Sequence, residues 1–167
     1  MTTGWETKPL GEVCDIRNGL WKGKKEPFVQ AGVIRNTNFS KDGSIDSSNI
    51  AYLDVESRQL EKRRLADGDI VLEKSGGGPK QAVGRVAYFE GLEGEFSFSN
   101  FTSAIRVLDA GVLDSRFLHR FLYWMYVSGI TERMQSHSTG IRNLNLSAYK
   151  QIEVPLPPLE EQKRIVA

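Results

Sequence analysis

The stretch LADGDIVLEKSGGGPKQAVGRVAYF, residues 65–89, decides the interpretation of the fold. Residues 70–72 and 83–89 are apolar, β-branched or aromatic and are bounded by turn formers, so each is predicted to be a strand. The loop between them, KSGGGPKQ, contains three successive glycines, whose bare backbone permits close approach of a partner. Lys74 and Lys80 make this loop positive, and no acid lies between Glu73 and Glu90. The loop therefore predicts contact with an anion, and the alternative is a flexible hairpin tip with solvated lysines.

A nucleotide-binding phosphate loop does not fit these residues. That motif has the form GxxxxGK[ST] and opens a helix, whereas no Lys-Ser or Lys-Thr pair follows the glycines here. The segment that follows is strand-like, so no helix N-terminus would face a phosphate.

Composition is that of a globular domain. The chain has 167 residues, 40% hydrophobic and 26% charged, which permits one domain with a core and a short appendage. The single cysteine, Cys14, excludes an internal disulfide and predicts a buried thiol, and no Cys or His spacing indicates a metal site. No signal peptide and no long apolar run is present, so we expect a cytoplasmic protein that does not enter the membrane.

The net charge of +1 is low for a nucleic-acid-binding domain, so the distribution of charge matters more than the sum. Three windows, residues 27–41, 74–89 and 133–152, have no acid and combine Arg or Lys with Asn, Gln, Ser or Thr. Arg and Asn carry donor and acceptor pairs that match guanine and adenine edges. The DNA-contacting candidates from these windows are Arg35, Asn36, Asn38, Lys74, Ser75, Lys80, Ser138, Thr139, Arg142 and Asn143.

The rest of the chain mixes strand and helix signals. We expect a strand over residues 28–34, a short helix capped by Asp54 and running to Arg64, and a half-buried strand over residues 96–107 with a bend at Asn100. Residues 114–134 have a helical apolar period interrupted by Gly129, and a polar loop over 137–145 follows. His137 and Ser138 are adjacent, but no orienting acid supports a nucleophile, so no catalytic residue is predicted.

The tail, IEVPLPPLEEQKRIV over residues 152–166, has an extended proline segment and then a helix that begins at Pro158 or Leu159. Together these signals predict an α+β fold, with a twisted, largely antiparallel sheet, packed helices and the start of a long helix.

The chain resembles the DNA-specificity (S) subunits of type I restriction-modification systems. The matching features, in order, are LGEV at 10–13, LADGDIVL at 65–72, a Ser-Gly loop, Gly84-Arg85, GIRNLN at 140–145 and the tail. The tail looks like the junction where a target-recognition domain passes into the family's conserved helix. The resemblance thus implies a target-recognition domain over 1–154, and over 155–167 the junction and the start of a spacer or dimerisation helix.

The resemblance implies a non-catalytic subunit that recognises one half of a bipartite target in double-stranded DNA. It implies no cofactor. Its implied partners are methyltransferase (M) subunits, a restriction (R) subunit in the complete complex, and a second copy or second half of the S subunit through the C-terminal helix. One recognition domain is expected to be either a half-subunit, with a palindromic target if it pairs with a second copy, or a fragment.

Two alternatives remain open. One is a DNA-modifying enzyme, either a methyltransferase or a nuclease, although the sequence has no N/D-P-P-Y/F tetrapeptide and no clustered nuclease carboxylates. The other is an assembly element that mainly holds methyltransferase subunits together.

Overall fold

The computed structural model describes residues 4–21, 23–76, 81–138 and 141–167. Its central sheet has the order β2-β9-β5-β7, with the bounds Cys14–Asn18, Thr102–Val107, Ile70–Glu73 and Val86–Tyr88. All three pairings in this sheet are antiparallel. The predicted strand over residues 70–72 is therefore the inner strand β5, while the predicted strand over 83–89 is shorter than expected.

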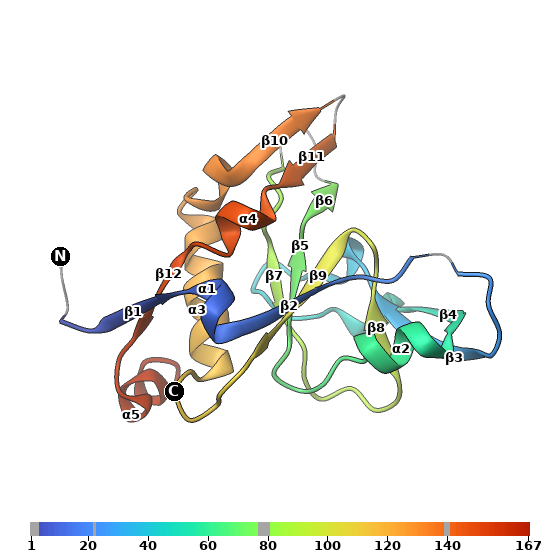
Figure 1. The fold of residues 1–167 in the computed structure, drawn as a ribbon, viewed down its shortest axis with the longest axis horizontal. Coiled ribbons are helices and arrows are strands. Elements are labelled where there is room, and N and C mark those ends of the chain that lie inside the picture. Colours follow the sequence, from blue (N-terminus) through green and yellow to red (C-terminus); the bar gives the residue numbers. More distant parts are fainter. Residues whose placement is uncertain (1–3, 22, 77–80, 139–140) are drawn as a thin grey trace.

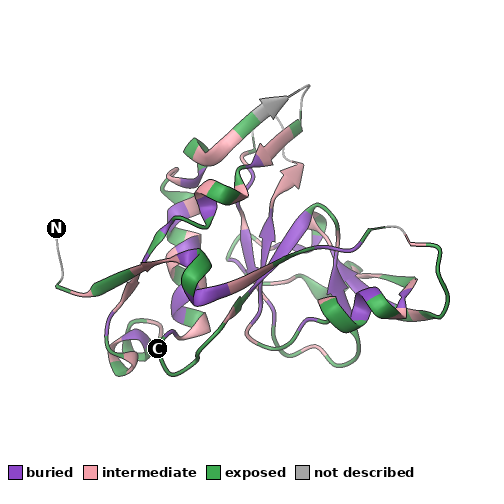
Figure 2. Cartoon of the chain, viewed as in Figure 1, coloured by how far each residue is buried: buried purple, intermediate pink, exposed green. Residues whose placement is uncertain are grey.

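β5 is buried on both faces, which explains its uninterrupted apolar sequence. Ile70 and Leu72 belong to one core cluster together with side chains of helix α3 (Ser115–Val127), including Phe117, Leu118 and Leu122. Val71, which points to the opposite face, belongs to a second cluster with residues of β3 (Phe28–Ile34) and β8 (Phe96–Phe98). The central sheet therefore lies between α3 and a second sheet, and its strands are largely in the buried colour (Figure 2).

The second sheet has the order β4-β3-β8, where β4 spans Ala51–Glu56. β3 pairs with β4 antiparallel and with β8 parallel. The predicted single strand over residues 96–107 is thus wrong. It consists of two strands in different sheets, β8 and β9, because the chain turns at Ser99 to Phe101 and Thr102 N–H donates to the Ser99 carbonyl at 3.0 Å.

Two smaller ladders complete the sheet structure. β1 (Glu6–Pro9) pairs with β12 (Glu153–Leu156), and β10 (Gln135–Ser138), β11 (Ile141–Leu144) and β6 (Ser75–Gly76) form a sheet in the order β10-β11-β6. Residues 137–145 were expected to be a loop, but most of them belong to this hairpin. Figure 1 shows the hairpin and β6 projecting together from the rest of the chain.

The helices follow the sequence signals closely, with one exception. Asp114 caps α3, since its carboxylate accepts the Phe117 N–H at 3.1 Å, and Gly129 lies beyond the helix end with φ +82°. The exception is Asp54, which was expected to cap a helix but lies inside β4; α2 (Ser57–Arg63) begins later and has no side-chain cap. The remaining helical segments are α1 (Leu10–Val13), η1 (Asn36–Asn38), η2 (Ser47–Asn49), η3 (Thr131–Met134), α4 (Leu146–Tyr149) and α5 (Leu159–Ile165).

α5 begins at Leu159, as the proline signal indicated, and its buried contact with the rest of the chain is made by Gln162. The Gln162 side chain is fully buried; it accepts the Asp114 N–H at 2.7 Å and donates to the carbonyls of Val112 and Pro157 at 2.8 and 2.9 Å. These bonds attach α5 to the segment that precedes α3. Along the described residues, no helix is long and apolar enough to cross a membrane.

Candidate nucleic-acid interface

A buried carboxylate at the end of β5 organises the polar face of the fold. The Glu73 side chain is 1% exposed and receives both arms of the Arg85 guanidinium, at 3.0 Å from Nε and 2.8 Å from Nη2. This paired hydrogen bonding raises the pKa of Arg85. Asn36 joins the same carboxylate, because its Nδ2 donates to Glu73 Oε2 at 2.9 Å, and Arg85 also donates to the Asn36 carbonyl at 3.2 Å.

Three of the residues expected to contact DNA are linked by this network. Asn36 Nδ2 also donates to the Ser75 carbonyl at 2.9 Å, and Ser75 Oγ donates to Asn143 Oδ1 at 2.8 Å. Ser75 and Asn143 are register partners where β6 pairs with β11. Residues that are up to 107 positions apart in the sequence, 36 and 143, therefore lie in one hydrogen-bonded row.

Lys74 lies beside this row without a carboxylate partner among the described residues. Its Nζ donates to Asn18 Oδ1 at 2.9 Å, and Ser103 Oγ donates to the same oxygen at 3.2 Å. Partial burial lowers the pKa of Lys74, because desolvation disfavours the charged ammonium. An anionic ligand at this position would therefore improve the electrostatic environment of Lys74.

The turn between β8 and β9 is the next part of this surface. The Phe101 carbonyl accepts the N–H groups of both Lys74 and Ser75, at 3.0 and 3.1 Å. Its ring is 51% exposed. The backbone of Phe101 is thus fixed against the two polar candidates, while its side chain faces solvent.

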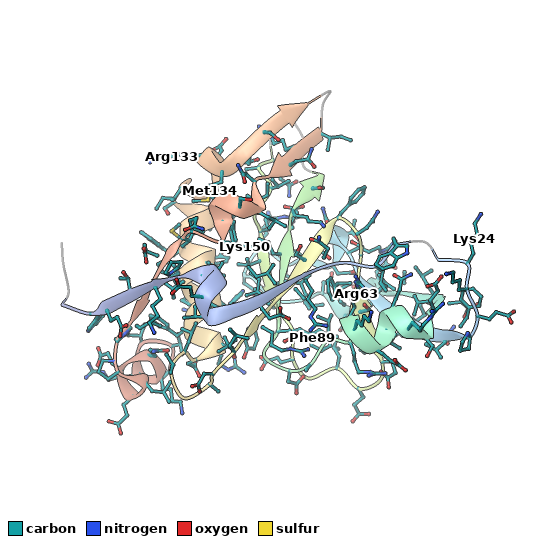
Figure 3. The ribbon with its side chains drawn as sticks, viewed as in Figure 1. Lys24, Arg63, Phe89, Arg133, Met134 and Lys150 are labelled. Carbon is teal, nitrogen blue, oxygen red and sulfur yellow. The ribbon has the colours of Figure 1, made fainter. Side chains whose placement is uncertain are left out.

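A basic segment borders the turn on its other side. Gly19 N–H donates to the Thr102 carbonyl at 3.1 Å, so the chain before Trp21 packs against the start of β9. Trp21 is 56% exposed and lies under the Arg63 guanidinium, whose centre is 4.5 Å from the ring centroid. Its N–H donates to Gln59 on α2, and Lys24 extends into solvent from the same segment (Figure 3).

We call the surface formed by these residues the candidate DNA surface: Asn18, Trp21, Asn36, Lys74, Ser75, Phe101 and Asn143. Four of its members were expected from the sequence. Asn18, Trp21 and Phe101 were not. The turn-forming sequence Arg17-Asn18-Gly19 is a signal that could have identified Asn18, but no pattern distinguishes Phe101 from the core phenylalanines around it.

The other expected residues lie elsewhere. Asn38 is 1% exposed, and its side chain accepts the Arg35 N–H and donates to the Asn49 carbonyl, so it holds the η1 turn together. Arg35 is half-buried. The Arg142 side chain is 11% exposed and approaches Glu132 at 3.5 Å, on the side of β11 opposite Asn143. Lys80 and Thr139 lie outside the described residues, and Ser138 is described only as part of β10.

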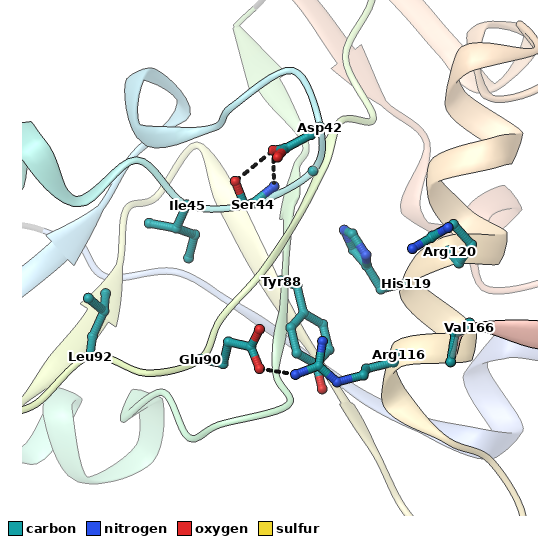
Figure 4. Close-up of a pocket in the computed structure, with 11 residues that line it drawn as sticks. Asp42, Ser44, Ile45, Tyr88, Glu90, Leu92, Arg116, His119, Arg120 and Val166 are labelled. Carbon is teal, nitrogen blue, oxygen red and sulfur yellow. Dashed lines mark hydrogen bonds and ion pairs between the residues drawn. The ribbon is translucent and has the colours of Figure 1, made fainter. Parts of the chain in front are cut away.

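A separate cavity of about 340 Å³ lies between α3 and the loop that contains Asp42 (Figure 4). Arg116 in its wall pairs with Glu90 and stacks over the Tyr88 ring at 4.9 Å, and Asp42 accepts from Ser44. Burial lowers the pKa of His119 here, which favours the neutral imidazole. Of the arginines that line the cavity, Arg116 is already paired with Glu90, and the cavity shares no lining residue with the candidate DNA surface. Within the described ranges, no group of three His, Cys, Asp or Glu residues is placed to hold a metal ion.

Comparison with known proteins identifies the family. Residues 2–167 match the model of the type I restriction modification DNA specificity domain. The chain is 26% identical over 175 residues to the type I restriction enzyme EcoKI specificity subunit of Escherichia coli K12, covering 97% of this chain and 34% of that subunit. A similar match, also 26% identical, covers 97% of this chain and 35% of the StySPI specificity subunit of Salmonella potsdam.

Solved structures agree on the fold. The HsdS subunit from Thermoanaerobacter tengcongensis superposes with a TM-score of 0.62 at 19% identity, over 99% of this chain and 36% of that one. The type I restriction-modification S subunit from M. genitalium gives a TM-score of 0.62 at 17% identity, over 99% and 38%. The chain therefore spans little more than a third of each of these relatives. The fold agrees with the expected α+β recognition domain, and the chain belongs to the type I restriction modification DNA specificity domain family.

Proposed function

We propose that this chain is a non-catalytic, sequence-specific DNA recognition domain, and that the candidate DNA surface contacts one half of a bipartite target. The observation that carries this proposal is the hydrogen-bonded row of Asn36, Ser75 and Asn143 beside Lys74, which has no carboxylate partner in the part of the chain that the structure describes. Amide and hydroxyl groups can read base edges, and a lysine can hold a phosphate. The family and the relatives, which are specificity subunits, support the same function.

In this proposal the polar side chains of the surface and the lysines have different roles. Asn36 uses both of its amide hydrogens, on Glu73 and on the Ser75 carbonyl, and its Oδ1 is buried, so Asn36 holds Ser75 in place. The bond between Ser75 Oγ and Asn143 Oδ1 orients the remaining polar atoms of these two side chains. Orientation before binding reduces the side-chain entropy that is lost when a base is contacted. Lys74 and Lys24 supply the positive charge that the low net charge of the chain does not reveal.

The enzyme alternative has no support from the comparisons, because the family and the relatives named above are specificity subunits. The assembly alternative is compatible with DNA recognition, because it concerns the tail over residues 155–167 and not the candidate DNA surface.

Residues 1–154 are, in this proposal, the target-recognition domain, and residues 155–167 begin the helix that meets the M subunits and a second copy or second half of the S subunit. Gln162 fixes α5 to the recognition domain, so the direction of the helix is set by the domain. Beside α5, an apolar groove is lined by exposed Trp124, Val127 and Ile165, which supports a protein contact there. Capture of M subunits by the full chain, and its loss when the chain is cut after Val154, would locate docking in the tail.

The test of DNA recognition is a titration of labelled duplexes at several salt concentrations, with the full chain in its assembled complex. We expect one sequence to bind more tightly than the others by about 10³-fold or more. Lys74→Ala should weaken binding to every sequence and lower the salt slope by about one, because one phosphate contact is lost. Lys8→Ala is the control, since Lys8 is a half-exposed lysine of β1 paired with Glu6. Equal affinity for all sequences would overturn the proposal.

A further inference from the structure

Phe101 is the aromatic side chain that the turn between β8 and β9 contributes to the candidate DNA surface. Hydrogen bonds hold this turn on both sides. Thr102 closes the turn, because its N–H and its hydroxyl both donate to the Ser99 carbonyl, at 3.0 and 2.8 Å. The Phe101 carbonyl accepts from Lys74 and Ser75. The backbone of Phe101, from which the ring projects, is therefore fixed relative to a cation and to a hydrogen-bonding hydroxyl.

The exposure of this ring is not explained by the fold. A single exposed apolar residue is ordinary, but this one lies within a polar, cationic surface and beside Lys74, which has no carboxylate partner among the described residues. A ligand that satisfies both groups must be anionic at one point and apolar a short distance away. A DNA duplex has this combination in the major groove, where the phosphate backbone borders the 5-methyl group of thymine.

We propose that the Phe101 ring packs against the 5-methyl group of a thymine in the major groove, so that Phe101 determines specificity at an A·T pair. This inference rests on the proposed DNA recognition and names one contact within it. Asn143, whose amide group matches adenine, lies in the same row and is bonded to Ser75.

The experiment replaces each thymine of the selected target by deoxyuridine, which removes only the 5-methyl group. For the wild-type complex we expect one position at which binding weakens about fourfold, the loss that follows from one buried methyl group. Phe101→Ala should weaken binding to the thymine duplex by at least the same factor and should lose no further affinity on the deoxyuridine duplex. Phe101→Leu should keep part of the discrimination. Leu108→Ala is the matched control, because Leu108 is 62% exposed and lies at the opposite end of β9, about 20 Å away.

Three results would overturn the inference. The first is that Phe101→Ala retains the preference for thymine over deoxyuridine. The second is that the wild-type complex is insensitive to deoxyuridine at every position. The third is that the fluorescence of 2-aminopurine placed in the target rises only when Phe101 is present, which would show that the ring inserts between bases and unstacks them. A wild-type complex that still distinguishes sequences under any of these results keeps the proposed function. A complex that binds all sequences equally would contradict both the thymine contact and the proposed function.

Discussion

Removal of Arg85 tests whether the buried Glu73 network positions the residues that contact DNA. Arg85→Ala leaves the carboxylate of Glu73, whose side chain is 1% exposed, with the Asn36 amide as its one remaining side-chain partner among the described residues. Loss of one partner from a buried ion pair costs about 3 to 5 kcal/mol, and we expect about 3 kcal/mol because Asn36 still donates. For a domain of this size, that loss lowers the melting temperature by about 6 to 12 °C.

The same change should damage DNA recognition by more than its effect on stability. Arg85 donates to the Asn36 carbonyl as well as to Glu73, so its loss removes the support of η1 and of the Asn36 side chain. We expect discrimination between the target and a single-base variant to fall about tenfold, the scale of one misplaced base contact. Duplex titrations well below the melting temperature measure this ratio on folded protein.

Arg106→Ala is the matched control. Arg106 makes the same two-armed pair with Asp69, whose side chain is 3% exposed, at 2.8 and 2.7 Å, and among the described residues neither side chain bonds to the candidate DNA surface. Because Arg106 is 52% exposed and water can replace it, we expect a smaller loss of about 2 kcal/mol with sequence discrimination intact. If both variants lost discrimination equally, or if neither did, the network would have no special role in recognition.

Three further outcomes follow from single side chains. Gln162→Leu should cost about 2 to 4 kcal/mol in chemical denaturation, because the Asp114 N–H and two carbonyls lose their partner, whereas exposed Lys163→Ala should change stability by less than about 0.5 kcal/mol. Burial raises the pKa of Cys14 to about 12, so a thiol reagent at pH 8 should leave the native protein unlabelled and label it on unfolding; fast labelling under native conditions would contradict this burial. Asn38→Ala should lower stability by about 1 to 3 kcal/mol through loss of the bonds to the Arg35 N–H and the Asn49 carbonyl, and a loss of sequence discrimination with unchanged stability would contradict this assignment.

Local signals in the sequence predicted the elements whose partners are close or whose burial is extreme. Residues 70–72 were identified as a strand because a short run of β-branched and aliphatic residues between turn-forming residues is typical of a buried strand. The α3 cap at Asp114 and the helix start at Leu159 were identified for similar reasons, since capping and proline geometry are local properties. Asp54 was misassigned because β4 continues through it, and pairing with β3 outweighed the capping preference.

Pairing between distant segments could not be predicted in this way. Whether residues 137–145 are a loop or a hairpin depends on β6, which supplies the partner for Arg142 and Asn143 and lies far away in the sequence. For the same reason the sequence did not show that residues 96–107 form two strands. β8 pairs with β3, whereas β9 pairs with β2 and β5. These choices depend on tertiary contacts rather than on local propensity.

Residue type likewise identified the candidate residues but not the direction of their side chains. Asn36 and Asn38 are two positions apart in one turn, yet Asn36 joins Ser75 while Asn38 turns inward to close the turn. Arg142 and Asn143 are adjacent on a strand, so they must face opposite sides, and only Asn143 meets Ser75. Chemistry alone would have ranked Arg142 above Asn143 as a base contact.

The sequence features that identify the family have a structural role that is separate from the proposed DNA contacts. Asp69 of the Gly-Asp-Ile segment accepts the Ala66 N–H and pairs with Arg106, while Arg85 of the Gly-Arg pair neutralises Glu73. Both ion pairs are anchored in the central sheet, whereas Phe101 lies on the turn that precedes its inner strand β9. A change at this exposed side chain leaves the buried pairs intact, so specificity can change at low cost in stability. A change at Glu73 or Arg85 instead removes the bonds that hold Asn36 and, through it, Ser75.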